Sequence, residues 1–125
     1  MPQADLKYSS DLSLDVPNLL AEIEALILRH DGGAGACKGR AYPAETAHHS
    51  HVLLEVQVLN KPHRDAAFMQ GLLADLVGLL DAALPKGTER AVSLGFAEPF
   101  YATGQALPCH IDPKCVKLRN KSRLL

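Results

Sequence analysis

The sequence lacks the segments that mark a chain inserted into or exported across a membrane. No apolar run reaches the roughly 18 residues that span a bilayer, and the opening residues MPQADLKYSS lack the basic-then-apolar order of a signal peptide. The composition, 47% apolar and 22% charged, is that of an ordinary globular protein. We therefore expect a soluble cytoplasmic protein that has no membrane partner.

The sequence also lacks cysteine or histidine at metal-binding or disulfide spacing. Cys37, Cys109 and Cys115 are odd in number and form no CxxC pair, so we expect free thiols. Residues 48–51 form an HHxH pattern in a polar loop, but no carboxylate or cysteine stands beside it at ligand spacing. We therefore expect no native metal site.

Net charge is nearly absent, at −1, but the charges are unevenly distributed. Residues 1–111 hold 8 Lys+Arg against 13 Asp+Glu, whereas residues 112–125 hold 5 against 1. A basic tail is a candidate for nucleic-acid binding, but this one has no interleaved aromatic residues and follows a proline-containing break. We expect one domain over residues 1–111, a poorly ordered tail over 112–125, and no nucleic-acid partner.

Hydrophobic periodicity predicts six elements in residues 1–111. Alternation typical of strands covers residues 3–8, 36–42, 51–59 and 91–97. Helical periodicity lies within residues 13–33 and 65–84, with Asp15 or Ser13 as the first cap and Asp65 as the second. The order strand–helix–strand therefore occurs twice.

This order predicts an α+β fold built from two βαβ units, with a four-stranded sheet and both helices on one face. The opposite face of the sheet would then lack a cover. In a chain of 125 residues self-association is the economical way to bury that face, so we expect a homo-oligomer.

Four segments carry a resemblance to a known family. They are MPQADLKYSSDL at the start, LDVPNLLAEIEALI in the first helix, GACKGRAYPAETA around the second strand, and HVLLEVQVLNKPHRDAAFMQGLLADLVGLLDAAL through the second helix. Up to about Ile111 the chain resembles 5-carboxymethyl-2-hydroxymuconate isomerase, of the tautomerase superfamily. The resemblance implies a homotrimeric isomerase without a metal or organic cofactor. Its implied reaction moves a proton between a dienol and its conjugated ketone, on a small 2-hydroxy or 2-oxo dicarboxylate from aromatic catabolism.

The resemblance assigns the general base to the amine of Pro2, which exists only if Met1 is removed. A free α-amine titrates at about 8, far below a lysine, so part of it is unprotonated near neutral pH. An apolar pocket and nearby cations would both lower this pKa further. The fixed proline ring also fixes the direction of the lone pair.

Three cations are candidates for binding the substrate carboxylates. Lys38 and Arg40 alternate on the second predicted strand and share a face, and Arg64 lies in the turn before the second helix. The family has arginines around all three positions. Lys38 departs from the family pattern, because an ammonium lacks the bidentate fork of arginine. The identity of the substrate therefore stays open.

Two other functions remain as alternatives. A non-catalytic ferredoxin-like binding or assembly module would share the order of elements and need no free proline. A hydratase or decarboxylase of the same superfamily would use the same amine on another unsaturated acid.

Overall fold

The structure is a computed structural model that describes residues 1–107. Its elements are β1 (Gln3–Ser9), α1 (Val16–His30), β2 (Lys38–Ala44), β3 (His51–Val58), α2 (Ala66–Ala83) and β4 (Glu89–Phe96). The predicted basic tail, Cys109 and Cys115 lie outside the described residues.

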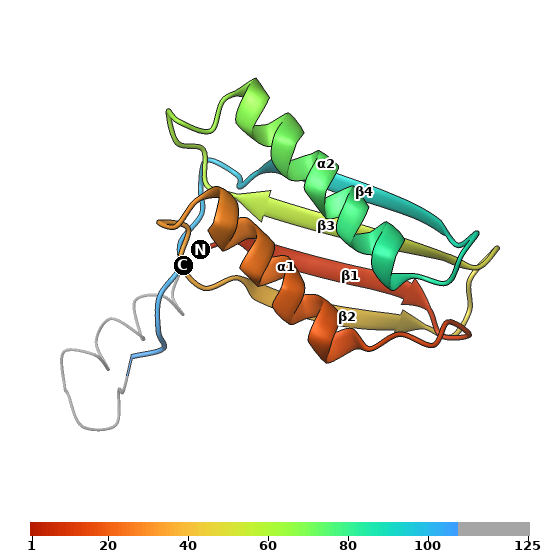
Figure 1. The fold of residues 1–125 in the computed structure, drawn as a ribbon. Helices are drawn as coiled ribbons and strands as arrows, with labels where there is room; N and C mark the ends of the chain where they lie inside the picture. The colour runs from red at the N-terminus through yellow and green to blue at the C-terminus, as the bar shows by residue number, and fades with distance from the viewer. Residues whose placement is uncertain (108–125) are drawn as a thin grey trace.

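The four strands form one mixed sheet in the order β2-β1-β3-β4. β1 pairs with β2 and β3 with β4 in parallel, and the two central strands β1 and β3 are antiparallel. Both helices lie on the same face of this sheet (Figure 1). Each helix connects two neighbouring parallel strands, so the predicted α+β fold with two βαβ units is confirmed.

Side-chain caps fix where the two helices begin. The Asp15 carboxylate accepts the backbone N–H of Asn18 at 3.3 Å, and the Asp65 carboxylate accepts that of Phe68 at 2.9 Å. Each carboxylate satisfies one of the orphan N–H groups in the first helical turn. Both caps are among those that the sequence predicted.

The second strand was the least well predicted element, since it covers Lys38–Ala44 rather than residues 36–42. It includes Pro43, which a sheet accepts because β2 is an edge strand. Gly39 faces α1, where a Cβ atom would lie 3.2 Å from Leu20 Cδ2. The backbone of β2 therefore approaches α1 closely at Gly39, and the residues on either side of it point to the opposite face.

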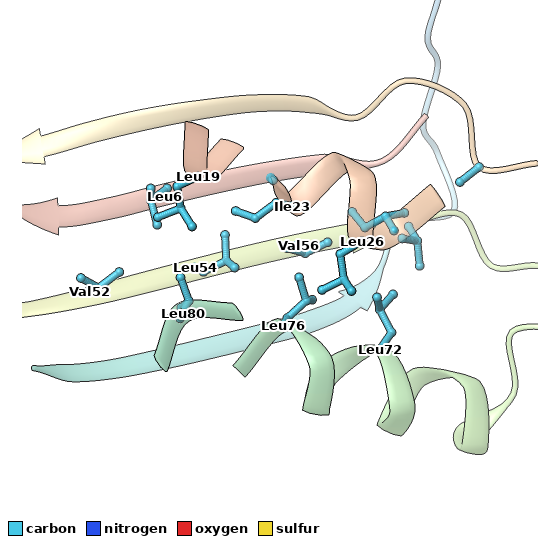
Figure 2. Close-up of a cluster of buried hydrophobic side chains, with 14 of the residues drawn as sticks. Leu6, Leu19, Ile23, Leu26, Val52, Leu54, Val56, Leu72, Leu76 and Leu80 are labelled. Carbon is cyan, nitrogen blue, oxygen red and sulfur yellow. The ribbon is translucent and has the colours of Figure 1, made fainter. Parts of the chain in front are cut away.

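The core lies between the helices and the sheet (Figure 2). Alternate residues of the central strands point into it, and α2 contributes leucines at a spacing of four, which is one helix face. Its largest fully buried aliphatic side chains are Leu6, Ile23, Ile27, Val52, Leu54, Val56, Val58, Leu72, Leu76 and Leu80.

By length and composition α2 is apolar enough to cross a membrane, with a mean hydropathy of 1.4 over its 18 residues. The sequence-based expectation concerned uninterrupted apolar runs, and Asp75 and Asp81 interrupt this window. A mostly buried core helix of a soluble protein passes the same test, and 17% of this window is buried. Here α2 packs on the sheet through Leu72, Leu76 and Leu80 and carries Asp75 and Asp81 on its exposed side.

The sheet face opposite the helices, which we call the open face, is polar near its middle. Gln3, Asp5 and Lys7 of β1 point to this face. The strand register places Lys38, Arg40 and Tyr42 of β2 beside them on one side and Gln57, Glu55 and Leu53 of β3 on the other. Both helices lie on the other face of the sheet, so this face carries the predicted cations Lys38 and Arg40 without a helix above them (Figure 1).

Candidate active site

The chain start is built into the sheet. Pro2 is fully buried, and its carbonyl oxygen accepts the backbone N–H of Lys38 at 2.9 Å. Because Gln3 also pairs with Lys38 of β2 and with Gln57 of β3, the first residues have partners on both sides. The position of Pro2 is therefore fixed by two neighbouring strands.

Arg40 lies on the open face next to this start. Its Nε donates to Asp5 Oδ1 at 2.7 Å, and its Nη1 donates to Gln3 Oε1 at 2.8 Å. The hydrogen bond that Arg40 donates to Asp5 is the main cause of the raised pKa of Arg40. The guanidinium therefore stays charged, and Asp5 of the same chain balances that charge.

Tyr101 reaches the chain start from the segment that follows β4. Its hydroxyl oxygen accepts a hydrogen bond from Gln3 Nε2 at 3.0 Å and donates to the carbonyl oxygen of Met1 at 3.3 Å. Figure 1 shows this segment passing beside the amino terminus. Side chains from both ends of the described chain therefore meet next to Pro2.

The pKa of the Cys37 thiol depends on the charges around the chain start. Burial, reinforced by Glu24, raises the pKa of this thiol to about 11. Arg40 and the terminal ammonium of Met1 oppose that rise. Arg40 and the amino terminus are therefore both within electrostatic reach of the Cys37 thiol.

Lys38 is exposed and sits at the entrance to β2, in register with Gln3. Its side chain makes no ion pair with any of residues 1–107. Of the three predicted cations, Lys38 therefore has its ammonium most available to an incoming anion.

Arg64 lies in the turn between β3 and α2 and is buried, with its side chain 2% exposed. Its Nη2 and Nε donate to Asp31 Oδ2 at 2.8 and 3.1 Å, and its Nη1 donates to the Leu59 carbonyl at 2.8 Å. Asp31 is the C-cap of α1. In this structure the guanidinium therefore ties the end of α1 to the turn before α2, and a carboxylate-binding role for Arg64 stays a prediction.

The Asp31 carboxylate receives more than one donor. His63 Nε2 lies 2.6 Å from the same Oδ2 atom that Arg64 contacts. The hydrogen bonds from His63 and then from Arg64 hold the pKa of Asp31 well below its usual range. Asp31 thus stays ionised in the fold to lower pH than in an unfolded chain.

The histidines at 48–51 stand at the far end of the sheet from Pro2, between β2 and β3. The rings of His48 and His49 are 4.2 Å apart, and His51 Nδ1 lies 2.9 Å from the His49 carbonyl. Among residues 1–107 no group of three or more His, Cys, Asp or Glu side chains is arranged to hold a metal ion. A hollow of about 390 Å³ between the beginning of α1 and the end of α2 is likewise remote from Pro2.

The fold of this chain is also found in solved structures. The chain has the tautomerase fold, shared with several crystal structures that differ widely from it in sequence. A 5-carboxymethyl-2-hydroxymuconate isomerase from Deinococcus radiodurans R1 superposes with a TM-score of 0.72 at 16% identity, over 83% of this chain and 88% of that one. A 5-carboxymethyl-2-hydroxymuconate delta-isomerase gives 0.64 at 20% identity, over 84% and 89%.

A macrophage migration inhibitory factor-like protein from Entamoeba histolytica gives a TM-score of 0.61 at 10% identity, over 83% of this chain and 95% of that one. Neither a protein-family model nor a curated protein matches the sequence. At these identities the comparisons establish the fold, and the activity has to be argued from this chain's own residues.

Three polar residues at the site were not predicted from the sequence: Gln3, Asp5 and Tyr101. The first two are visible as open-face positions of β1, because they alternate with Ala4 and Leu6. No local pattern indicates Tyr101, since it follows the last strand and meets Gln3 across 98 positions of sequence.

Replacing Asp31 with Asn is expected to lower the thermal midpoint at neutral pH, because Arg64 loses its ionised partner. The pKa of Asp31 is lowered by folding, so its contribution is present above the unfolded carboxyl pKa of about 3.9 and is lost as pH falls further. The difference in midpoint between the parent protein and Asp31→Asn should therefore narrow below about pH 4. Thermal melts across this range measure it.

Asp81→Asn is the matched control, because Asp81 pairs with Arg90 at an exposed site and should change the midpoint little at any pH. A difference between the parent and Asp31→Asn that stays constant down to acidic pH would contradict this account of Asp31.

Proposed function

We propose that the protein is a cofactor-independent tautomerase whose general base is the amine of Pro2, released when Met1 is removed. Its substrate is a small unsaturated 2-hydroxy or 2-oxo carboxylate, of which 5-carboxymethyl-2-hydroxymuconate is an example. The observation that carries the proposal is the placement of Pro2, buried at the start of a central strand and bonded through its carbonyl to Lys38 at 2.9 Å. The shared fold supports it.

The reaction needs one group that accepts a proton and returns it. The free Pro2 amine takes the hydroxyl proton of a dienol, and the resulting ammonium delivers a proton to the distant carbon of the conjugated system. The enol O–H bond breaks, a C–H bond forms and the double bonds shift, so the substrate and product are isomers and the amine is regenerated. An amine with a reference pKa of about 8 suits both steps near neutral pH.

The surroundings favour an unprotonated amine. Pro2 is fully buried in the chain that retains Met1. Desolvation disfavours the ammonium form of an amine, and each pKa unit corresponds to about 1.4 kcal/mol.

On the open face, Lys38 is the first candidate to bind the substrate carboxylate. Arg40 is already charge-balanced by Asp5 at 2.7 Å, whereas Lys38 has no ion-pair partner among the described residues 1–107. An anion that contacts Lys38 would find Arg40 two residues further along the same face of β2. Arg64 acts from the other side of the sheet by holding Asp31.

The sheet topology disfavours the ferredoxin-like form of the alternative. In that arrangement the two parallel strands of a βαβ unit are split by a further strand. Here β1 lies directly beside β2, and β3 directly beside β4. A superfamily hydratase or decarboxylase would use the same amine, and NMR analysis of the products distinguishes these reactions from tautomerisation.

The central test compares two forms of one sequence that differ only at Met1. Protein with Met1 removed should convert phenylenolpyruvate or 2-hydroxymuconate to the keto isomer. Protein made while methionine aminopeptidase is inhibited should be inactive, because the Pro2 nitrogen is then a non-basic amide. Intact mass identifies each form, and ultraviolet absorbance follows the reaction.

Pro2→Ala, with Met1 removed, should lose about 10²-fold or more in kcat while keeping its circular dichroism spectrum. Full activity in the form that retains Met1, or in Pro2→Ala, would refute the proline mechanism.

Lys38→Gln is expected to raise KM for these substrates about 10-fold, because a charge-assisted hydrogen bond to the carboxylate is lost. Lys86→Gln removes the same charge from the exposed turn before β4 and serves as the control. Steady-state kinetics on both variants test whether Lys38 binds the substrate. An unchanged KM in Lys38→Gln would show that Lys38 does not contribute to substrate binding.

We also propose that the protein is a homotrimer in solution, joined through the open face. Both helices lie on the opposite face, so further copies of the chain are the economical cover (Figure 1). Size-exclusion chromatography with light scattering should give three times the 13.5 kDa chain mass. A monomer at micromolar concentration would contradict the proposal.

A further inference from the structure

The Tyr101 hydroxyl holds a carbonyl oxygen next to the Pro2 nitrogen. It donates to the Met1 carbonyl oxygen at 3.3 Å, and the carbon of that carbonyl is bonded to the Pro2 nitrogen. Adding the width of one peptide carbonyl puts the Tyr101 oxygen at most about 5.5 Å from the Pro2 nitrogen. An oxygen atom between the two can lie at about 2.8 Å from each, which is hydrogen-bond distance.

The direction of this hydrogen bond is imposed by a chain of donors. Arg40 can only donate, so the Gln3 side chain must turn its oxygen to Arg40, at 2.8 Å, and its NH₂ group to Tyr101, at 3.0 Å. The Tyr101 oxygen then accepts from Gln3, and its own proton points to the Met1 carbonyl. Asp5 fixes the Arg40 side chain, because its Oδ1 accepts a hydrogen bond from Arg40 Nε at 2.7 Å.

We infer that Tyr101 is a catalytic residue that donates a hydrogen bond to the substrate oxygen from which Pro2 takes the proton, with Gln3 as its positioning residue. In the unprocessed chain the Met1 carbonyl oxygen stands in for that substrate oxygen. The inference rests on the proposed function. It adds the group that recognises the substrate oxygen, which becomes anionic as the proton leaves.

A tyrosine suits this task because a phenol keeps its proton at neutral pH, with a reference pKa of about 10. Its O–H bond is aimed before substrate binds, so little reorganisation is needed when charge develops on the oxygen. The donors from Arg40 through Gln3 polarise one another and strengthen the last hydrogen bond of the chain.

Tyr101→Phe, made in protein without Met1, removes only the hydroxyl and should lower kcat on phenylenolpyruvate about 10²-fold with little change in KM. Tyr8→Phe is the control, since Tyr8 lies at the other end of β1 against the core. Unchanged kcat in Tyr101→Phe overturns the inference and leaves the role of Pro2 standing.

Gln3→Glu tests the direction of the hydrogen bond while the hydroxyl is kept. A carboxylate accepts from both Arg40 and Tyr101, so the Tyr101 proton would turn away from the substrate, and kcat should fall as in Tyr101→Phe. Gln70→Glu adds the same charge at an exposed position of α2, away from the open face, and should not reproduce the loss. Equal effects of the two glutamates would mean that charge, rather than proton direction, is responsible.

A readout without turnover separates this inference from the proposed function. The sequence has 3 tyrosines, so ring labelling with ¹³C at Cζ gives one assignable signal for each. The Tyr101 signal should move when Met1 is removed, and move again when phenylpyruvate is added to the Met1-free protein but not to Gln3→Glu. Inactive Met1-free protein would refute the proposed function. If the Tyr101 signal also stays unmoved, the inference about Tyr101 is overturned as well. If the signal shows the expected shifts, carbonyl binding by Tyr101 is upheld even in inactive protein.

Discussion

The candidate site depends on one constraint: Met1 and Pro2 lead directly into β1, a central strand of the sheet. Gln3 has a strand partner on each side, Lys38 on β2 and Gln57 on β3, and the residue before it is anchored through its carbonyl. Chain termini are usually the least ordered part of a domain. Here two strand ladders fix the terminus, so a group attached to it has a defined position relative to side chains on β2 and after β4.

Two arginines that look alike in the sequence have opposite surroundings in the fold. Arg40 lies on the open face and shares its donors between Asp5 and Gln3, with its side chain 41% exposed. Arg64 is buried beside Asp31 on the helix side. A buried guanidinium without its carboxylate would be costly, so the Asp31 pair is what permits Arg64 to lie there. Asp31 in turn serves as the C-cap of α1, so the pairing joins the end of α1 in one βαβ unit to the turn before α2 in the other.

Local patterns predicted the elements and their order because hydrophobic period and cap residues act within a few positions. Asp15, Asp65 and the alternation in β1 and β3 are of this kind. The register is not local. That Asp5 faces Arg40 follows from pairing β1 with β2 through Gln3 and Lys38, and the contact of Tyr101 with Gln3 requires the chain to return past its own start. The sequence therefore indicated Lys38 and Arg40 as members of one face, but not the residues that orient them, nor that Arg64 would be buried.

The near-symmetry of the fold gives a physical reason to expect the proposed chemistry in only one half. The two βαβ units place the starts of β1 and β3 in equivalent settings, each beside the start of a parallel edge strand. Where Gln3 pairs with Lys38 in the first unit, His51 pairs with Glu89 in the second, and the position of Arg40 is taken by Ala91. The second unit therefore offers an acidic residue where the first offers a cation, and its strand follows a loop rather than the chain start. A base with a pKa near 8 together with an anion-binding face requires both a terminus and positive charge, and only the first unit combines them.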